Sequence, residues 1–520
     1  NNHKSIISLV PEYGLEKEKE QKEADKLAEY KSTLTNDELE ELVKKTKELK
    51  EYQDTPSSQE DLEKIPMLEL SDIKREPAKD YNDVKSVDGI KIVHHNIFTN
   101  KIAYINMSFD TKCVPDELIP YMGLLGSTLS LMDTKNYTYP ALTSEINIIW
   151  GGLATGTALY SDKVDFSKNT IVYEVKSKAL YEKVPFVLGM MEEIMYNTRF
   201  DDYKRLKEII ARIKSRLEAS LMGQGHSIAM LECCAQFSES AYYSDILRGY
   251  KYYEFIKKLD EEFEQNKTQI VDKLNKLVGY IFNKDNVIVS LTADDEGYDC
   301  FVKALSAKSC NIKDEHYNTA VRSFIPVNVK TGYTSASQVQ YVARCGNFVK
   351  DGYKYTGALK VLKVIFSYDY LWINVRVKGG AYGCMSGSSR NGDFYMVSYR
   401  DPNLEKTNDI YEGAADYIRN FNVSRRDMVK FIIGTIGEID APLTPSAIGS
   451  RSFTHYMCNC TEDMLRKDRE EVLDATVESI RELAPLIESA VGQNYLCVVG
   501  NQKQINEAAD LFDEIKPLIG

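Results

Sequence analysis

The sequence predicts an α+β protein in which a helical hairpin precedes two tandem, homologous α+β units. Three observations lead to this prediction: a charged helical start, mixed helix and strand patterns after it, and an internal repeat. The 520 residues exceed the length of one ordinary domain. We place the hairpin and a linker at 1–80, the first unit at 81–325 and the second unit at 326–520.

The first part of the chain is rich in strong helix formers that carry opposite charges three and four residues apart, as in "GLEKEKEQKEADKLAEYKSTL" and "NDELEELVKKTKELKEYQ". Thr35 followed by Glu38 is the pattern of a capping box. We expect an antiparallel helical hairpin that serves as a solvated spacer. A coiled-coil partner is the alternative, although the seam is short. The second helix carries one apolar stripe: Leu39, Leu42, Val43 and Leu49.

A connector with Pro56, Pro66 and Pro77 follows, and a mixed pattern begins near Gly89. The segments "IKIVHHNIF" and "IAYINMSFD" alternate as strands do, and we expect them to pair with each other. The segment "ELIPYMGLLGSTLSLM" is apolar throughout and predicts a buried helix.

The repeat relates residues 85–315 to residues 330–520. A strand precedes a long helix in each copy, "TIVYEVKSK" in the first and "FYMVSYRDP" in the second. "INIIWGGLATG" matches "INVRVKGGAYG", and "NVIVSL" matches "YLCVVG" near the end of each copy. We expect "PVNVKTGYTSAS" to link the two copies. The apolar spacing of the long helix is Leu206, Ile209, Ile210 and Ile213 in the first copy and Val429, Ile432, Ile433 and Ile436 in the second.

Bulk composition excludes several classes of protein. The net charge is −13, and residues 1–80 hold 14 basic and 21 acidic residues, so a nucleic-acid surface is not expected. No apolar run has the ~20 residues of a membrane helix, and "NNHKSIISLV" does not resemble a signal peptide. We therefore expect no membrane partner, ten reduced cysteines and a cytoplasmic location. Because the chain does not begin with Met, we expect a fragment or a processed form.

The histidines and cysteines offer few catalytic candidates. His94 and His95 point to opposite faces of a strand and are expected to pack or to lie on the surface. His226, in "GQGHSIAM", fits a helix cap or a packing residue, and Cys233–Cys234 fits buried thiols. The segment "HYMCNC" holds metal-capable atoms in His455, Cys458 and Cys460, but its cysteines diverge on a helix and no second ligand cluster accompanies it. The common motifs HExxH, HxxEH, GxSxG and GxxxxGK[ST] are absent from the sequence.

The segment "RVKGGAYG" remains as the candidate site. Gly379 and Gly380 suit a tight bend between a helix and a strand that begins at Tyr382. Arg376, one turn earlier, would then point to the same side of the bend. A fixed cation beside a neutral phenol can hold a peptide carbonyl or its developing oxyanion. The alternative is a surface salt bridge at Arg376 and simple packing at Tyr382.

The run "YLWINVRVKGGAYGCMSGS" resembles the C-terminal-half motif of presequence proteases, which belong to the pitrilysin/insulysin superfamily of inverted-motif zinc metallopeptidases. The resemblance extends over the whole chain. "ELEELVKKTKELKEYQDTPSSQEDLEKIPMLELSDIKRE" is similar to the hairpin and linker that join the two halves of those enzymes. "YPALTSEINIIWGGLATGTALYSD" and "APLTPSAIGSRSF" are similar to further segments of their C-terminal half.

The resemblance implies two units of the mitochondrial processing peptidase type. It also implies a zinc endopeptidase that degrades short unstructured peptides inside a closed chamber. The N-terminal half of such an enzyme carries HxxEH and binds zinc, so the zinc ligands are not expected in this chain. By resemblance, Arg376, Gly379, Gly380 and Tyr382 bind substrate, with Arg376 holding the substrate backbone and Tyr382 donating to the oxyanion.

Two explanations of the missing zinc motif stay open. The chain is the C-terminal half of a longer enzyme and is inactive alone, or it is a natural partner subunit of a zinc-bearing protein. The alternative function is a non-catalytic scaffold or peptide-binding subunit of a two-subunit processing peptidase. A self-sufficient zinc protein that uses His455, Cys458 and Cys460 would require stoichiometric metal on this chain.

Overall fold

The computed structural model describes residues 3–8, 10, 14–55, 58–149, 151–307 and 311–519. Pro56, Trp150 and Cys310 lie outside these residues. The chain forms two compact units, Asn1–Leu68 and Glu69–Gly520. The boundaries at residues 80 and 325 stay predictions. None of the helices in the described ranges combines the length and the apolar character needed to cross a bilayer.

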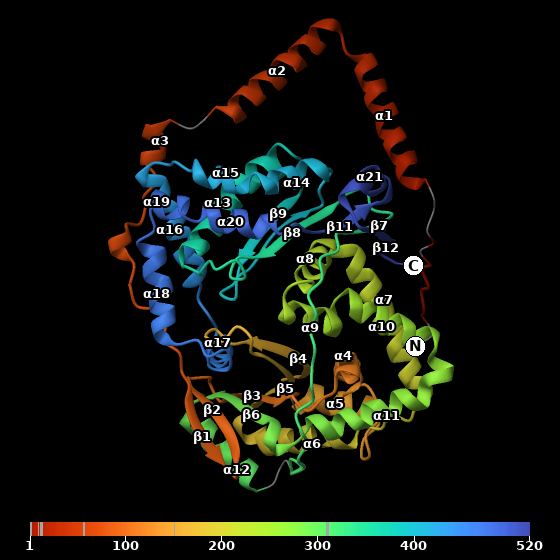
Figure 1. Cartoon of the computed structure of the whole chain (residues 1–520). Coiled ribbons are helices and arrows are strands. Elements are labelled where there is room, and N and C mark those ends of the chain that lie inside the picture. The colour runs from red at the N-terminus through yellow and green to blue at the C-terminus, as the bar shows by residue number, and fades with distance from the viewer. Residues whose placement is uncertain are drawn as a thin grey trace. The chain divides into compact units, whose positions relative to one another are not determined.

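The first unit contains the two expected helices, α1 (Leu15–Thr33) and α2 (Asn36–Asp54), and a short α3 (Gln59–Glu63). The capping box is confirmed: Glu38 N donates to Thr35 Oγ1 at 3.3 Å, and Thr35 N donates to Glu38 Oε2 at 2.8 Å. The helices diverge from their turn instead of packing side by side (Figure 1). Leu42, Val43 and Leu49 stay exposed. The expected antiparallel packing is therefore wrong, because α1 presents charged residues around most of its surface and offers no matching apolar stripe.

The second unit begins with an α+β repeat built on a six-stranded sheet. Its elements are β1 (Asp83–Val87), β2 (Ile90–Asn96), β3 (Ile102–Asp110), α4 (Ile119–Thr128), α5 (Tyr139–Ile149), β4 (Leu153–Ser161), β5 (Asn169–Leu180), α6 (Val184–Asn197), α7 (Tyr203–Gly223), α8 (Gly225–Ala235), α9 (Glu239–Arg248), α10 (Tyr250–Glu261), α11 (Phe263–Ile281), β6 (Val287–Ala293) and α12 (Asp295–Ser306).

A second α+β repeat with its own six-stranded sheet follows. Its elements are β7 (Thr331–Ser335), β8 (Tyr341–Asn347), α13 (Ala358–Tyr368), the π-helix η5 (Trp372–Val377), β9 (Gly383–Ser388), β10 (Asp393–Tyr399), α14 (Glu405–Glu412), α15 (Ala414–Arg419), α16 (Arg425–Ile439), α17 (Pro445–Met457), α18 (Glu462–Leu473), α19 (Val477–Arg481), α20 (Ala484–Gly492), β11 (Tyr495–Asn501), α21 (Gln502–Glu507) and β12 (Glu514–Pro517).

The two sheets have the same topology. Their orders are β1-β2-β6-β3-β5-β4 and β12-β7-β11-β8-β10-β9. β2 and β6 are parallel, as are β7 and β11, and the three pairings that follow in each sheet are antiparallel. Only the first edge strand differs, since β1 is antiparallel to its neighbour and β12 is parallel. The expected α+β class and the internal repeat are confirmed.

Two expectations about the strands are wrong. β2 and β3 do not pair with each other, because β6 lies between them. The short separation of β2 and β3 in the sequence favoured a hairpin between them. Instead β6, from the far end of the repeat, lies between them and pairs in parallel with β2. The segment "PVNVKTGYTSAS" is not wholly a linker, because Thr331–Ser335 forms β7 inside the second sheet. The connecting segment therefore ends at Lys330.

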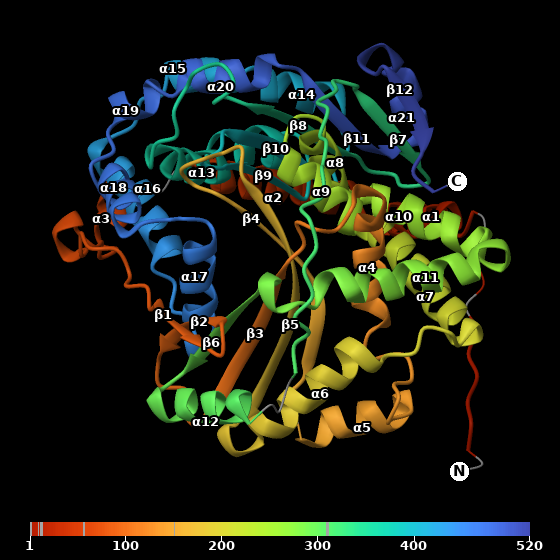
Figure 2. The same ribbon diagram turned by 60° about the horizontal axis from the view of Figure 1, so that its bottom comes forward.

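One helix of each repeat packs on the sheet of the other repeat. α8, from the first repeat, packs on the second sheet in an apolar cluster that includes Ala229, Cys233 and Ala343. α17, from the second repeat, lies beside β2 and β6 of the first sheet (Figure 2), where Phe453 packs near Val93. The opposite face of each sheet packs on helices of its own repeat. The nine described cysteines are free thiols, and Cys233 and Cys234 are buried as expected.

The paired histidines of β2 are buried side chains of the first sheet. His94 Nε2 lies 3.0 Å from the carbonyl oxygen of Ala293. His95 is fully buried and its Nε2 lies 2.9 Å from Ser290 Oγ. Burial lowers the pKa of His95 to about 4 and also lowers the pKa of His94. Both side chains are therefore structural and neutral near pH 7.

This burial predicts a loss of stability in mild acid. The folded pKa of His95 lies below its unfolded value of about 6.5, so the contribution is present above pH 6.5 and is lost as the pH falls toward 4. We expect the free energy of unfolding to fall by about 3 kcal/mol over this range from His95 alone. Denaturant unfolding at several pH values should show a flatter profile for His95→Gln and an unchanged profile for His3→Gln. A native profile in His95→Gln would contradict the assignment.

Candidate functional site

A glycine bend joins η5 to β9, as the sequence predicts. Gly380 has φ +83°, a conformation that L side chains rarely adopt. A Cβ on Gly379 would lie 2.4 Å from the carbonyl oxygen of Val375. Gly380 N donates to the carbonyl oxygen of Arg376 at 2.8 Å, and Ala381 N donates to that of Val375 at 3.1 Å. Both glycines are therefore needed for the chain to turn here.

The bend brings Arg376 and Tyr382 to the same side. Arg376 Nη1 donates to the carbonyl oxygen of Tyr382. The guanidinium carbon lies 4.3 Å from the centre of the Trp372 ring and 5.3 Å from the centre of the Tyr382 ring. These distances fit cation–π contacts on two rings. β9 begins at Gly383, so Tyr382 lies one residue before the strand. We call residues 376–382 the Arg–Tyr bend.

The Arg–Tyr bend lies on an open surface. Tyr382 is 64% exposed, and Val377 beside it is 65% exposed. Trp372 and Tyr368, in the preceding helical stretch, are 39% and 71% exposed. Large exposed apolar side chains in one place are typical of surfaces that another molecule covers. The pair is therefore neither separated nor enclosed by the described residues.

The pair offers two kinds of hydrogen-bond donor to a ligand. Among the described residues, none makes a hydrogen bond with the Tyr382 hydroxyl. The Arg376 guanidinium uses one of its five N–H donors on the bend itself. A neutral phenol and a guanidinium side by side suit a polarised carbonyl oxygen.

Buried groups support the bend from beneath. Asn403 Nδ2 donates to the carbonyl oxygen of Gly379 at 2.6 Å. Asp401 is fully buried and accepts from Asn403 N at 2.9 Å and from the Thr407 hydroxyl at 2.7 Å. Burial raises the pKa of Asp401. This network holds the carbonyl of Gly379 and thereby the course of the bend.

An aromatic chain connects the bend to the first repeat. The rings of Tyr382 and Tyr399 are 5.8 Å apart at 69°. Behind them, His226 of α8 lies 4.8 Å from Tyr399 at 80° and 6.2 Å from Tyr341. Burial lowers the pKa of His226, and its Nδ1 has no hydrogen-bond partner among the described residues. These ring contacts agree with the packing role that the sequence predicts for His226.

Sequence reasoning missed three contributors to this site. Trp372 lies four residues before Arg376, a helical spacing that places the two side chains together and could have identified it. Tyr399 is the last residue of the neighbouring strand β10 and Asn403 follows that strand, and no local pattern links them to the bend. Their role depends on the antiparallel pairing of β9 with β10.

The three side chains of the segment "HYMCNC" that could bind a metal do not come together. His455 Nδ1 lies 2.6 Å from Asp80 Oδ2, Cys458 is buried at the end of α17, and the structure does not gather His455, Cys458 and Cys460. Within the described ranges, one group of metal-capable side chains comes together, and all of its members are exposed: Asp285, Asp314 and His316. This exposed group lacks the closed environment of a catalytic zinc centre.

The first repeat contains a similar glycine bend that has neither a guanidinium nor a phenol at the matching positions. There α5 ends at Ile149, and Gly151–Gly152 leads into β4. With the two glycine pairs aligned, Ile148 stands at the position of Arg376 and Ala154 at that of Tyr382. The bend of the second repeat therefore carries a guanidinium and a phenol, and the bend of the first repeat carries neither.

Comparison with known proteins identifies relatives over the whole chain. A family described as associated with peptidases of family M16, subfamily C, matches residues 9–259, and the family described as "PreP C-terminal domain" matches residues 332–501. Protein HypA of Clostridium perfringens is 39% identical over 524 residues, which are 100% of this chain and 53% of that protein. Presequence protease 1, chloroplastic/mitochondrial, of Arabidopsis thaliana is 29% identical over 527 residues, 100% of this chain and 48% of that protein. The chain thus spans about half the length of these relatives.

Solved structures share the fold at low sequence identity. The peptidase M16 inactive domain from Pseudomonas fluorescens has a TM-score of 0.54 at 15% identity, covering 84% of this chain and 98% of that one. A protease from Helicobacter pylori has a TM-score of 0.56 at 13% identity, covering 81% of this chain and 99% of that one.

We predict that two glycine-to-alanine substitutions change the free energy of unfolding in opposite directions. Gly379→Ala should lower the free energy of unfolding by about 2 kcal/mol, because the new Cβ meets a backbone oxygen that cannot move away alone. Gly437→Ala on α16 is the matched control, because its Cβ meets open space and alanine favours a helix by up to about 1 kcal/mol. Thermal and denaturant unfolding measure both. Equal effects of the two substitutions would show that the bend tolerates a side chain.

Proposed function

Because the chain is the C-terminal half of a presequence-protease-like peptidase of the M16 family, we propose that it supplies substrate-binding and oxyanion-stabilising groups to a zinc endopeptidase. The complete enzyme degrades short unstructured peptides inside a closed chamber. The zinc ligands and the base that activates water belong to an N-terminal half, on the same polypeptide or on a partner subunit. This chain alone cleaves nothing.

The pairing of Arg376 with Tyr382 is the observation that supports this proposal. Both donors are held by a bend whose glycines allow no side chain at Gly379 and a left-handed backbone at Gly380. A preorganised donor needs little reorganisation when charge develops on the substrate, which is the condition for strong transition-state stabilisation. The exposed apolar side chains around the bend support its coverage by another part of the enzyme.

The two side chains have separate tasks. Arg376, fixed against Trp372, binds a backbone carbonyl of the extended substrate and keeps the scissile peptide in register. The Tyr382 hydroxyl donates a hydrogen bond to the carbonyl oxygen as that oxygen becomes negative. A zinc ion held by the other half would supply an activated water. No described group of this chain fits that role, so the contribution of this chain is binding and charge stabilisation.

The alternative function is a non-catalytic scaffold or a peptide-binding subunit of a two-subunit processing peptidase. The first repeat supports it, because its fold persists without the guanidinium and the phenol. The two functions differ in one measurable respect. Only the catalytic proposal requires the hydroxyl of Tyr382 for turnover once the zinc-bearing half is present.

We predict that Tyr382→Phe lowers kcat by about 100-fold in an enzyme reconstituted with its zinc-bearing half, with KM little changed. The hydroxyl acts only when charge develops, so ground-state binding of the peptide keeps its strength. Steady-state cleavage of a fluorogenic peptide measures both constants.

Tyr353→Phe is the matched control, because this tyrosine is 37% exposed after β8 and does not belong to the exposed apolar surface named around the Arg–Tyr bend. It should leave kcat and KM unchanged. An unchanged kcat in Tyr382→Phe would exclude the oxyanion role, and cleavage by the isolated chain would exclude the division of labour between two halves.

A further inference from the structure

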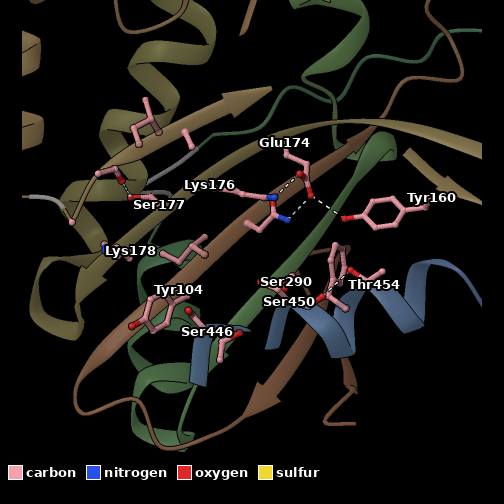
Figure 3. A pocket seen from close by; sticks show the side chains of 18 residues that line it. Tyr104, Tyr160, Glu174, Lys176, Ser177, Lys178, Ser290, Ser446, Ser450 and Thr454 are labelled. Atoms are coloured by element: carbon pink, nitrogen blue, oxygen red, sulfur yellow. Dashed lines mark hydrogen bonds and ion pairs between the residues drawn. The ribbon is translucent and has the colours of Figure 1, made fainter. Parts of the chain in front are cut away.

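A second site lies on the first sheet, in a cavity of about 400 Å³ beside α17 (Figure 3). Its floor is the face of β3 and β5 that does not pack on the helices of the first repeat. One wall is α17, which contributes Ser446 and Ser450, and the opposite wall is the bend at Gly151–Gly152. We call this cavity the lysine pocket, after Lys176 and Lys178 of β5, which line it.

The register of the strands places the polar groups of the floor on one face. Lys178 pairs with Tyr104 on β3, and Lys176 pairs with Asn106. Across β3, Tyr104 pairs with Thr292 on β6. Because side chains alternate between faces along a strand, the two lysines two residues apart share the open face.

The two lysines on the floor of the cavity differ in whether a carboxylate neutralises them. Glu174 is buried and binds the Lys176 ammonium at 2.6 Å, Asn106 Nδ2 at 2.8 Å and the Tyr160 hydroxyl at 3.0 Å. This carboxylate therefore neutralises Lys176. Among the described residues, none forms an ion pair with Lys178, so the pocket keeps one uncompensated positive charge.

The walls of the cavity add a neutral hydrogen-bond donor and a glycine bend without side chains. α17 begins above the cavity, with Thr444 as its N-cap, so the positive end of this 13-residue helix and the Ser446 hydroxyl lie at the rim. Gly152 has φ +115°, and a Cβ there would meet none of the described residues within 4 Å. Lys178 also covers Gly151, where a Cβ would lie 2.4 Å from its Cγ.

The packing of the first sheet does not require the polar side chains that line the lysine pocket. The corresponding face of the second sheet is apolar, with Tyr333, Ala343, Cys497 and Val499, and α8 covers it. On the first sheet, α17 covers the part over β2 and β6, and the polar part over β3 and β5 stays open. A sheet face that a helix could have sealed instead carries lysines and hydroxyls beside a cavity.

We propose that the lysine pocket binds a carboxylate group of an extended peptide, with the Lys178 ammonium as its counter-ion and the Ser446 and Ser450 hydroxyls as donors. One uncompensated positive charge matches one carboxylate. A phosphate dianion would need more cations and would meet Glu174, and none of the described residues that line the cavity is an arginine. The choice of a peptide as the carrier of this carboxylate rests on the proposed function.

Equilibrium binding to the 520-residue chain tests this site without any catalytic step. The probes are three hexapeptides of alanine and serine labelled with an uncharged BODIPY dye: one with a free C-terminal carboxylate, one with a C-terminal amide, and one amide with an internal aspartate. We expect fluorescence anisotropy to give a dissociation constant about 10-fold lower for a carboxylate probe than for the plain amide. The difference between the free-acid and aspartate probes identifies the terminus or the side chain as the source.

Lys178→Met should abolish the preference for the carboxylate while keeping the apolar stem of the side chain. Lys204→Met, at an exposed lysine of α7, is the matched control and should keep the preference. Ser450→Leu, an exposed position on α17, should weaken binding by filling the cavity, and it preserves the test if Lys178→Met unfolds.

Equal binding of acid and amide probes to the native chain, including no binding of either, would overturn the proposal, as would an unchanged preference in Lys178→Met. These results are independent of turnover in a reconstituted enzyme, so failure here leaves the role of Tyr382 to its own test.

Discussion

The cover that α8 provides for the second sheet is the contact on which the rest of the structure depends. The face that includes Tyr341, Ala343 and Val499 is apolar and must be removed from water, and the helix that does this comes from the first repeat. A Cβ at Gly225 would lie 2.3 Å from the Tyr341 ring, so the helix approaches the sheet closely at its first residue. This contact joins two repeats that could otherwise separate, and it places His226 behind Tyr399, which packs on Tyr382. The geometry of the Arg–Tyr bend therefore depends on residues far away in the chain.

The reciprocal contact, between α17 and the first sheet, is less complete. α17 covers the first sheet over β2 and β6 with Phe453, but its polar first turns leave the lysine pocket beside them. The second repeat keeps the guanidinium and the phenol at its bend, and the first keeps only the glycines and an adjacent charged cavity. A glycine bend that leads into an edge strand thus carries chemically different side chains in the two repeats.

The sequence predicted the parts of this structure that depend on local chemistry. The capping box at Thr35, the glycine bend at Gly379 and the long helix at Leu206 follow from residue type and spacing, and the structure contains all three. The pairing of β2 with β6 depends on a strand almost 200 positions away, and no local pattern shows it. The same holds for Asn403 under the bend and for α8 on the second sheet. The open arrangement of α1 and α2 was missed because an apolar stripe on one helix does not show whether the other helix offers a complement.

A structure of the complete enzyme with a bound peptide tests the central claim most directly, through the distance between the Tyr382 hydroxyl oxygen and the carbonyl oxygen of the scissile bond. A zinc-bearing half that completes the site should bring these atoms within about 3 Å, the reach of a hydrogen bond. Arg376 should then contact the substrate backbone while staying on the Trp372 ring. A Tyr382 that faces solvent, or a different surface, while the peptide lies at the zinc would contradict the account.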